Sequence, residues 1–187
     1  MPCAIEAASV MSRMMFEGWG EFYLLAGSAA AVLIGLIFVV VTLMQDRPRS
    51  SVLNGSRLYM GPVVLHVSFV LMLSAAALIP DMTATMFAAA CAVVAAWGLL
   101  RGANSIVGIW NLSGTDAPHW TDVWFYGVLP TILYAVLAVV AWAFWIGAGW
   151  AVNAISVVIT GLLLVSIRNE WDLVTWLAPR PDSRDEH

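Results

Sequence analysis

The feature that most limits what this chain can fold into is a set of long stretches without any charged side chain. No Asp, Glu, Lys or Arg occurs in residues 22–45, 58–80, 83–100 or 123–167. An α-helix needs about 20 apolar residues to cross the hydrocarbon core of a bilayer, which is about 30 Å thick. Each stretch reaches or approaches that length, so the sequence predicts an all-α integral membrane protein.

The composition argues against a separate water-soluble domain. Only 11% of the 187 residues are charged and 61% are hydrophobic, whereas soluble domains contain about 25% charged residues. The polar stretches between the apolar ones are too short to enclose a core of their own. We therefore expect one membrane domain over residues 1–187, with the lipid bilayer as its surroundings. The net charge of −4 gives no sign of a nucleic-acid partner.

The apolar stretches divide into a predicted bundle of five transmembrane helices. As one helix, residues 123–167 would extend about 67 Å, more than twice the thickness of the bilayer core. This stretch must fold back, and Gly147-Ala148-Gly149 is the natural break. Pro130 is expected to kink the helix before that break. The predicted helices cover residues 21–45, 58–80, 84–100 or as far as 110, 122–146 and 150–176.

The placement of arginine predicts the orientation of the bundle. The chain has eight Arg and no Lys, and cytoplasmic loops of membrane proteins carry an excess of these residues. With five spans and the N-terminus outside, seven arginines fall on the cytoplasmic side and only Arg13 falls outside. The ten tryptophans fit this arrangement, because most lie near a predicted membrane boundary. The sequence therefore predicts an outside N-terminus and a cytoplasmic C-terminus.

Small residues predict where helices approach one another closely. In the first helix Gly27, Ala31 and Gly35 repeat every four residues, a spacing that lets helices pack in lipid. This face serves either internal packing or self-association into an oligomer. The fifth helix has a second small and polar face, made by Asn153, Ser156, Thr160 and Gly161. Hydrogen bonds between helices explain the second face, and a solvated pore lining is the alternative.

His66 is the clearest candidate for a functional residue. It lies about two turns into the second predicted helix, and an ionisable side chain inside a span is a functional hypothesis by default. It is a neutral imidazole hydrogen-bonded in the core, a proton-relay or pH-sensing group, or a metal or haem ligand. Bis-histidine haem would need a second intramembrane His, but His119 lies in a loop and His187 is the last residue. We therefore predict no metal site and no cofactor.

A polar cluster of Arg168, Asn169, Glu170 and Asp172 lies at the cytoplasmic end of the fifth predicted helix. Arg168 and Asp172 are four residues apart and face each other across one turn. One interpretation is an interfacial salt bridge. The other is an anion or lipid-headgroup site that Arg101 and Asn104 of the third helix complete.

The first helix also carries a resemblance to other sequences. Residues 22–31 read Phe-Tyr-Leu-Leu-Ala-Gly-Ser-Ala-Ala-Ala, and residues 35–41 read Gly-Leu-Ile-Phe-Val-Val-Val. An Ala-rich segment followed by Gly-Leu-x-Phe-Val is similar to the first helix of a group of small bacterial polytopic membrane proteins known only as hypothetical. The similarity covers about residues 21–80. It implies a location in the bacterial inner membrane and brings no activity with it.

Missing motifs narrow the possible functions. The chain has no Lys for a retinal Schiff base, no C-x-x-C pair, no G-x-S-x-G element and no phosphate-binding Gly-rich loop with Lys. The helices show no duplicated half, which argues against an inverted-repeat transporter within one chain. Nothing in the sequence therefore supports an enzyme.

Two classes of function remain as expectations. The first is an accessory or structural membrane protein that acts through helix contacts with itself or with a larger complex. The second is a small oligomeric ion or proton channel or transporter, which needs one cavity lined by His66, Asn153, Ser156 and Thr160. A membrane enzyme is a third and less supported possibility, because it would need Arg168, Asp172 and His66 to share a cleft.

Overall fold

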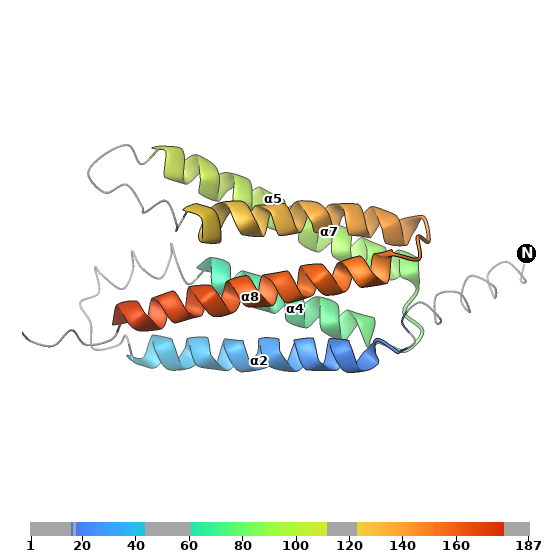
Figure 1. The fold of residues 1–187 in the computed structure, drawn as a ribbon, viewed down its shortest axis with the longest axis horizontal. Coiled ribbons are helices and arrows are strands. Elements are labelled where there is room, and N and C mark those ends of the chain that lie inside the picture. Colours follow the sequence, from blue (N-terminus) through green and yellow to red (C-terminus); the bar gives the residue numbers. More distant parts are fainter. Residues whose placement is uncertain (1–15, 17, 44–60, 112–122, 178–187) are drawn as a thin grey trace, which may run out of the picture.

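The described part of the chain is an all-helical bundle. The computed structural model describes residues 16, 18–43, 61–111 and 123–177, which contain helices and short connections but no strand (Figure 1). In chain order the elements are α2 (Gly20–Leu43), α4 (Gly61–Ala77), α5 (Ala84–Asn111), the π-helix η2 (Val123–Val128), α7 (Leu129–Trp145) and α8 (Ala151–Leu177).

Four helical segments are long and apolar enough to cross a membrane. They are Gly20–Thr42, Ala84–Asn104, Val123–Trp145 and Ala151–Asp172. The apolar part of α4, Val63–Ala77, is shorter. The fold is therefore compatible with the helical integral membrane protein that the apolar stretches predict.

One helix takes the longer of its two predicted ranges, and another is shorter than predicted. The third predicted helix continues past residue 100, and α5 ends at Asn111. The second ends early, at Ala77, because the chain closes a turn in which Leu78 N donates to Ala75 O at 3.1 Å. Asp81 follows with a φ of +60°. Residues 44–45, 58–60 and 122, at the ends of predicted helices, lie outside the described residues.

Thr83 starts α5 by capping it. Its hydroxyl accepts a hydrogen bond from Met86 N at 3.2 Å, and its carbonyl accepts one from Phe87 N at 2.9 Å. The bond to the hydroxyl satisfies a backbone N–H group that has no partner within the first helical turn, and the bond to the carbonyl is the first regular bond of the helix.

The fourth predicted helix is irregular next to Pro130, where the sequence predicts a kink. Val123–Val128 form the π-helix η2, and Pro130 lies in the first turn of α7. Because proline has no N–H, the Tyr126 carbonyl four residues earlier loses its α-helical donor. The backbone bonds of a π-helix span five residues. The wider turn therefore lies where the regular hydrogen-bond ladder cannot continue.

Successive long helices run in opposite directions along the bundle (Figure 1). One end, which we call the Arg168 end, holds the last turns of α2, α5 and α8 and the starts of α4 and η2. The opposite end, which we call the Gly147 end, holds the turn between α7 and α8. Gly147 has a φ of +70°, a conformation that favours glycine after a helix end.

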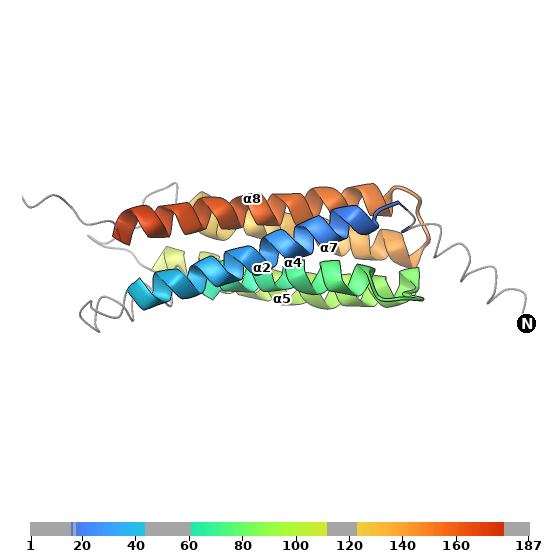
Figure 2. The same cartoon turned by 90° about the horizontal axis from the view of Figure 1, so that it is seen from below.

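The long helices form two antiparallel pairs joined by α8. α2 packs mainly on α4, and α5 packs mainly on α7. α8 lies between these pairs and contacts α7, α4 and α2 (Figures 1 and 2). We refer to them as the α2·α4 pair and the α5·α7 pair.

Glycine allows the closest helix contacts. A Cβ atom at Gly98 would overlap the ring of Tyr134, and one at Gly102 would overlap the Thr131 hydroxyl. Both contacts join α5 to α7. At Gly161 of α8, a Cβ would lie 2.9 Å from Leu133 Cδ2 of α7.

The predicted small-residue face of α2 is only partly used inside the bundle. A Cβ at Gly27 would lie 3.2 Å from Ser74 Cβ of α4, whereas no atom lies within 4 Å of that position at Gly35. Ala31 is exposed, as is Gly35. The buried face of α2 consists instead of Tyr23, Ala26, Ala30, Leu33, Ile37 and Val40.

Candidate functional site

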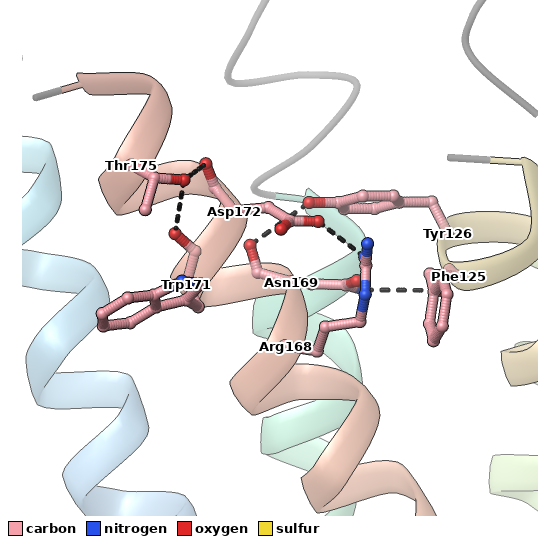
Figure 3. Close-up of polar contacts among 7 residues, drawn as sticks. All are labelled: Phe125, Tyr126, Arg168, Asn169, Trp171, Asp172 and Thr175. Carbon is pink, nitrogen blue, oxygen red and sulfur yellow. Dashed lines mark hydrogen bonds and ion pairs between the residues drawn. The ribbon is translucent and has the colours of Figure 1, made fainter. Parts of the chain in front are cut away.

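The predicted pair of Arg168 and Asp172 forms an ion pair at the Arg168 end (Figure 3). Arg168 Nη1 donates to Asp172 Oδ2 at 2.6 Å, with side chains 33% and 38% exposed. The guanidinium carbon of Arg168 also lies 3.7 Å from the ring centroid of Phe125 in η2. The positive charge of Arg168 is therefore shared between a carboxylate and an aromatic face.

Asn169 connects α8 to the π-helix. Its side chain is fully buried, and Nδ2 donates to the Phe125 carbonyl at 3.4 Å (Figure 3). The Tyr126 hydroxyl donates to the Asn169 backbone carbonyl at 3.2 Å. These two bonds fix the irregular turn against α8. Sequence reasoning missed Phe125 and Tyr126, for which the aromatic run before Pro130 was the available signal.

Glu170, the residue after Asn169, is also buried. Glu170 Oε1 and Asn169 Oδ1 are buried and have no hydrogen-bond partner in the described part of the chain. A charged group in a membrane-spanning helix normally finds a partner or faces a cavity. Glu170 belongs to the polar cluster that the sequence indicates, but its burial without a described partner for Oε1 emerges only from the structure.

The other two members of the predicted headgroup site lie on α5. Arg101 and Asn104 are both exposed. Arg101 Nη2 lies 3.9 Å from where a Cβ at Gly61 would be, so the side chain reaches the start of α4. The structure thus joins Arg168 to Asp172 and places Arg101 beside a different helix at the same end.

His66 forms a separate polar site inside the bundle. Its Nδ1 lies 2.6 Å from Tyr134 Oη, and the His66 side chain is only 5% exposed. Phe69 packs edge-on against the Tyr134 ring, and Gly98 leaves the space that this ring occupies. His66 Nε2 is buried without a hydrogen-bond partner among the described residues. Neither Tyr134 nor Gly98 was predicted, because only the tertiary structure brings them to His66.

The polar residues of α8 lie away from His66. Asn153 and Thr160 are exposed, and the Ser156 hydroxyl donates to the Asn153 carbonyl of its own helix at 2.7 Å. Their neighbours in the helix, Val152, Ile155 and Ile159, face the core. The structure therefore places His66 inside the bundle and the other pathway candidates towards its outside.

The interior next to His66 is apolar. Val67 and Val70 of α4 are fully buried. Within the described ranges no group of three or more His, Cys, Asp or Glu side chains could hold a metal ion. His66 and the Arg168–Asp172 pair have different partners, Tyr134 for the first and Phe125 for the second.

Comparison with known proteins does not suggest a function, so the functional assignment rests on the geometry described above. No protein family, curated protein or solved structure matches this chain. The resemblance of residues 21–80 to small bacterial membrane proteins stays a prediction.

Proposed function

We propose that this chain is a non-enzymatic membrane protein of accessory or structural role in the bacterial inner membrane. It acts through helix contacts with further copies of itself or with a larger membrane complex. In this proposal all five long helices span the bilayer, the N-terminus lies outside and the C-terminus lies in the cytoplasm.

The alternating helix directions support five spans (Figure 1). α4 has 17 residues, and a helix of that length extends about 26 Å, close to the bilayer core of about 30 Å. Exposed tryptophans occur towards both ends of the bundle, including Trp145 and Trp150 at one end and Trp171 at the other. Such side chains favour the headgroup level on both sides of a membrane.

The positions of two arginines support the orientation. Arg101 and Arg168 both lie towards the Arg168 end, although they come from different helices. Arginine is enriched on the cytoplasmic side of membrane proteins. We therefore assign the Arg168 end to the cytoplasm.

The observation that carries the proposed role is the separation of the polar residues that a conduction pathway would need. His66 bonds to Tyr134 in the interior, whereas Asn153 and Thr160 point outwards from α8. Val67 and Val70 of the same helix are fully buried and apolar. In one copy of the chain, the arrangement of these polar groups therefore fits helix packing better than an ion-conduction pathway.

The outward faces provide surfaces for contact with other helices. Ala31 and Gly35 on α2, and Asn153 and Thr160 on α8, are exposed. In lipid, helices associate through small residues that permit close approach and through hydrogen bonds between polar side chains. Both kinds of contact are therefore available on the outside of the bundle.

Site-specific photo-crosslinking in native membranes tests the proposed role. With Cys3 and Cys91 replaced by Ala, a benzophenone reagent is attached to Gly35→Cys or to Thr160→Cys. Leu36→Cys is the matched control, because Leu36 is 50% exposed but lies about 100° around α2. We expect discrete crosslinked products at position 35 or 160 and none at 36. Products at none of the three positions would contradict the proposal.

The buried ionisable side chain of His66 favours a second candidate, an oligomeric proton or ion channel or transporter. Such side chains inside a span often mark proton relays. In this alternative several copies would combine His66 and the α8 residues Asn153, Ser156 and Thr160 into one pathway. The two candidates differ in whether the purified protein alone moves ions across a bilayer.

A further inference from the structure

Two arginines at the Arg168 end differ in what neutralises their charge. Arg168 pairs with Asp172 and lies over the ring of Phe125. The side chain of Arg101 is exposed, and it forms no ion pair or hydrogen bond within the described ranges. The positive charge of Arg101 is therefore available to an anion from outside the described bundle.

The acidic side chains of the described residues do not supply this anion. Glu21, at the start of α2, and Asp81, before the start of α5, lie at the Gly147 end. At the Arg168 end, Glu170 is buried and Asp172 already binds Arg168. The partner of Arg101 is thus more naturally a group of the surrounding membrane.

Arg101 lies where the headgroups of a bilayer begin. The apolar segment of α5 is Ala84–Asn104, and from Ala84 to Arg101 the helix rises about 26 Å, close to the bilayer core of about 30 Å. Arg101 Nη2 lies 3.9 Å from the Cβ position of Gly61, which precedes the apolar part of α4, Val63–Ala77. The guanidinium therefore reaches the edge of the apolar layer, as long basic side chains do at a membrane surface.

The outer face of α5 is apolar on the membrane side of this charge. Val93, Trp97 and Leu100 are exposed large side chains. Because residues three and four apart share one face of a helix, Arg101 and Asn104 continue the same face towards the Arg168 end. Along the helix this face changes from aliphatic to indole and then to guanidinium and amide. A phospholipid has the same order of acyl chain, ester region and phosphate, and indoles favour the middle level.

We propose that this face of α5 binds an anionic phospholipid, with its phosphate at Arg101 and an acyl chain along Val93, Trp97 and Leu100. A guanidinium binds phosphate oxygens through charge-assisted hydrogen bonds, and basic residues next to a span attract anionic lipids. Asn104 offers an amide donor one turn further along. The site requires that α5 crosses the bilayer, but it goes beyond the accessory role and does not depend on it.

This site differs from the headgroup site that the sequence predicts. The predicted site combines Arg101 and Asn104 with Arg168 and Asp172, whereas the last two satisfy each other in the structure. Arg101 reaches towards the start of α4 instead. The lipid site therefore belongs to α5 alone.

Native mass spectrometry of the full chain, released from mixed micelles, tests the proposal. The micelles are titrated with phosphatidylglycerol or with phosphatidylcholine, which has the same phosphate but no net charge. We expect the chain to retain phosphatidylglycerol at lower lipid concentrations than phosphatidylcholine. Equal retention of the two lipids would overturn the proposal. A dimer that retains no lipid would assign this face to a second copy and would also overturn it.

Two variants locate the preference for the anionic lipid. Arg101→Gln should lower the fraction of chain with bound phosphatidylglycerol about fivefold, a modest factor because water screens an exposed charge pair. Arg168→Gln is the matched control, because it removes the same charge at the same end, but Asp172 already neutralises that charge. Its effect should be less than about twofold. Equal losses would indicate a general attraction to this end of the bundle and would overturn the proposal. The comparison of lipids on the wild-type chain stands even if a variant fails to fold.

Glycerol 3-phosphate distinguishes a lipid from a soluble phosphate compound. It carries a phosphate without acyl chains, so it cannot use the contacts with Val93, Trp97 and Leu100. We expect no displacement of phosphatidylglycerol at equal concentration. Displacement would assign Arg101 to a soluble phosphate compound and overturn the lipid site. Crosslinking from positions 35 and 160 tests the accessory role separately.

Discussion

The α5·α7 pair and the α2·α4 pair differ in how closely their two helices approach each other at glycine. Between α5 and α7, Gly98 and Gly102 lie directly under the side chains of Tyr134 and Thr131. In the α2·α4 pair, Gly27 faces Ser74 less closely, because a Cβ there would lie 3.2 Å from Ser74 Cβ. Close backbone approach is the main source of helix association in lipid. The α5·α7 pair is therefore the more rigid part of the bundle.

The pairs also differ in their buried polar atoms. Three such atoms without a hydrogen-bond partner lie in the described part of the α2·α4 pair, namely Tyr23 Oη, His66 Nε2 and Ser74 Oγ. None lies in the described part of the α5·α7 pair. Unpaired buried polar groups are destabilising and often accompany function. We infer that the α5·α7 pair provides stability and the α2·α4 pair carries the polar chemistry.

The largest expected effect is at Gly98. Gly98→Ala should lower the free energy of unfolding by about 3 kcal/mol, because the new Cβ overlaps a ring that cannot easily move. Gly35→Ala is the control and should change stability by less than about 0.5 kcal/mol, since nothing faces that position. Unfolding in mixed detergent micelles measures both. Equal effects at the two positions would remove the basis for calling the α5·α7 pair the rigid one.

The next largest effect on stability is expected at Tyr134, in contrast to the other buried tyrosine, Tyr23. Tyr134→Phe leaves His66 Nδ1 without its partner and should cost about 1–2 kcal/mol. Tyr23→Phe removes a hydroxyl with no partner in the described residues, so it should be neutral or stabilising. The same unfolding assay compares them. A larger loss for Tyr23→Phe would show that the α2·α4 pair is better satisfied than we infer.

A smaller effect is expected within the α2·α4 pair. Gly27→Ala places a Cβ 3.2 Å from Ser74 Cβ and should lower stability by about 1 kcal/mol. Ser74→Gly removes the opposing atom, so the double variant should recover most of the loss. Additive losses in this double-mutant cycle would mean that the two residues do not oppose each other.

The smallest effect concerns the ion pair at the Arg168 end. Arg168→Gln should lower stability by about 0.5 kcal/mol, because Arg168 and Asp172 are about one third exposed and water screens them. Arg168→Lys should recover only part of the loss, since lysine lacks the planar group that lies over Phe125. Stability at low and high salt measures the electrostatic part. A loss above about 2 kcal/mol would point to a buried, functional pair.

The helical architecture follows from features that are local in the sequence. Charge-free runs predicted the helices, and α8 (Ala151–Leu177) lies within one residue of its predicted range at each end. Gly147 gave the turn before α8, since its positive φ favours glycine. Arg168 and Asp172 were predicted to face each other because four residues make about one helical turn.

The rest depends on contacts between residues far apart in the chain. Nothing in the sequence near His66 indicates that Tyr134, 68 positions later, is its partner. The stripe of Gly27, Ala31 and Gly35 predicts close packing, but it does not say which part faces a helix and which faces lipid. In the same way, Pro130 predicts an irregularity, but the position of η2 (Val123–Val128) also depends on bonds from Asn169 of α8.

The most direct test of the account is proton and ion flux into liposomes that contain the purified protein, with His66→Ala as the paired variant. The account assigns Val67 and Val70 to an apolar layer and His66 to an isolated site. It therefore predicts no flux above that of empty vesicles at any pH or with any ion tested. Flux that exceeds the empty-vesicle level and falls in His66→Ala would contradict the accessory role and establish a pathway through His66.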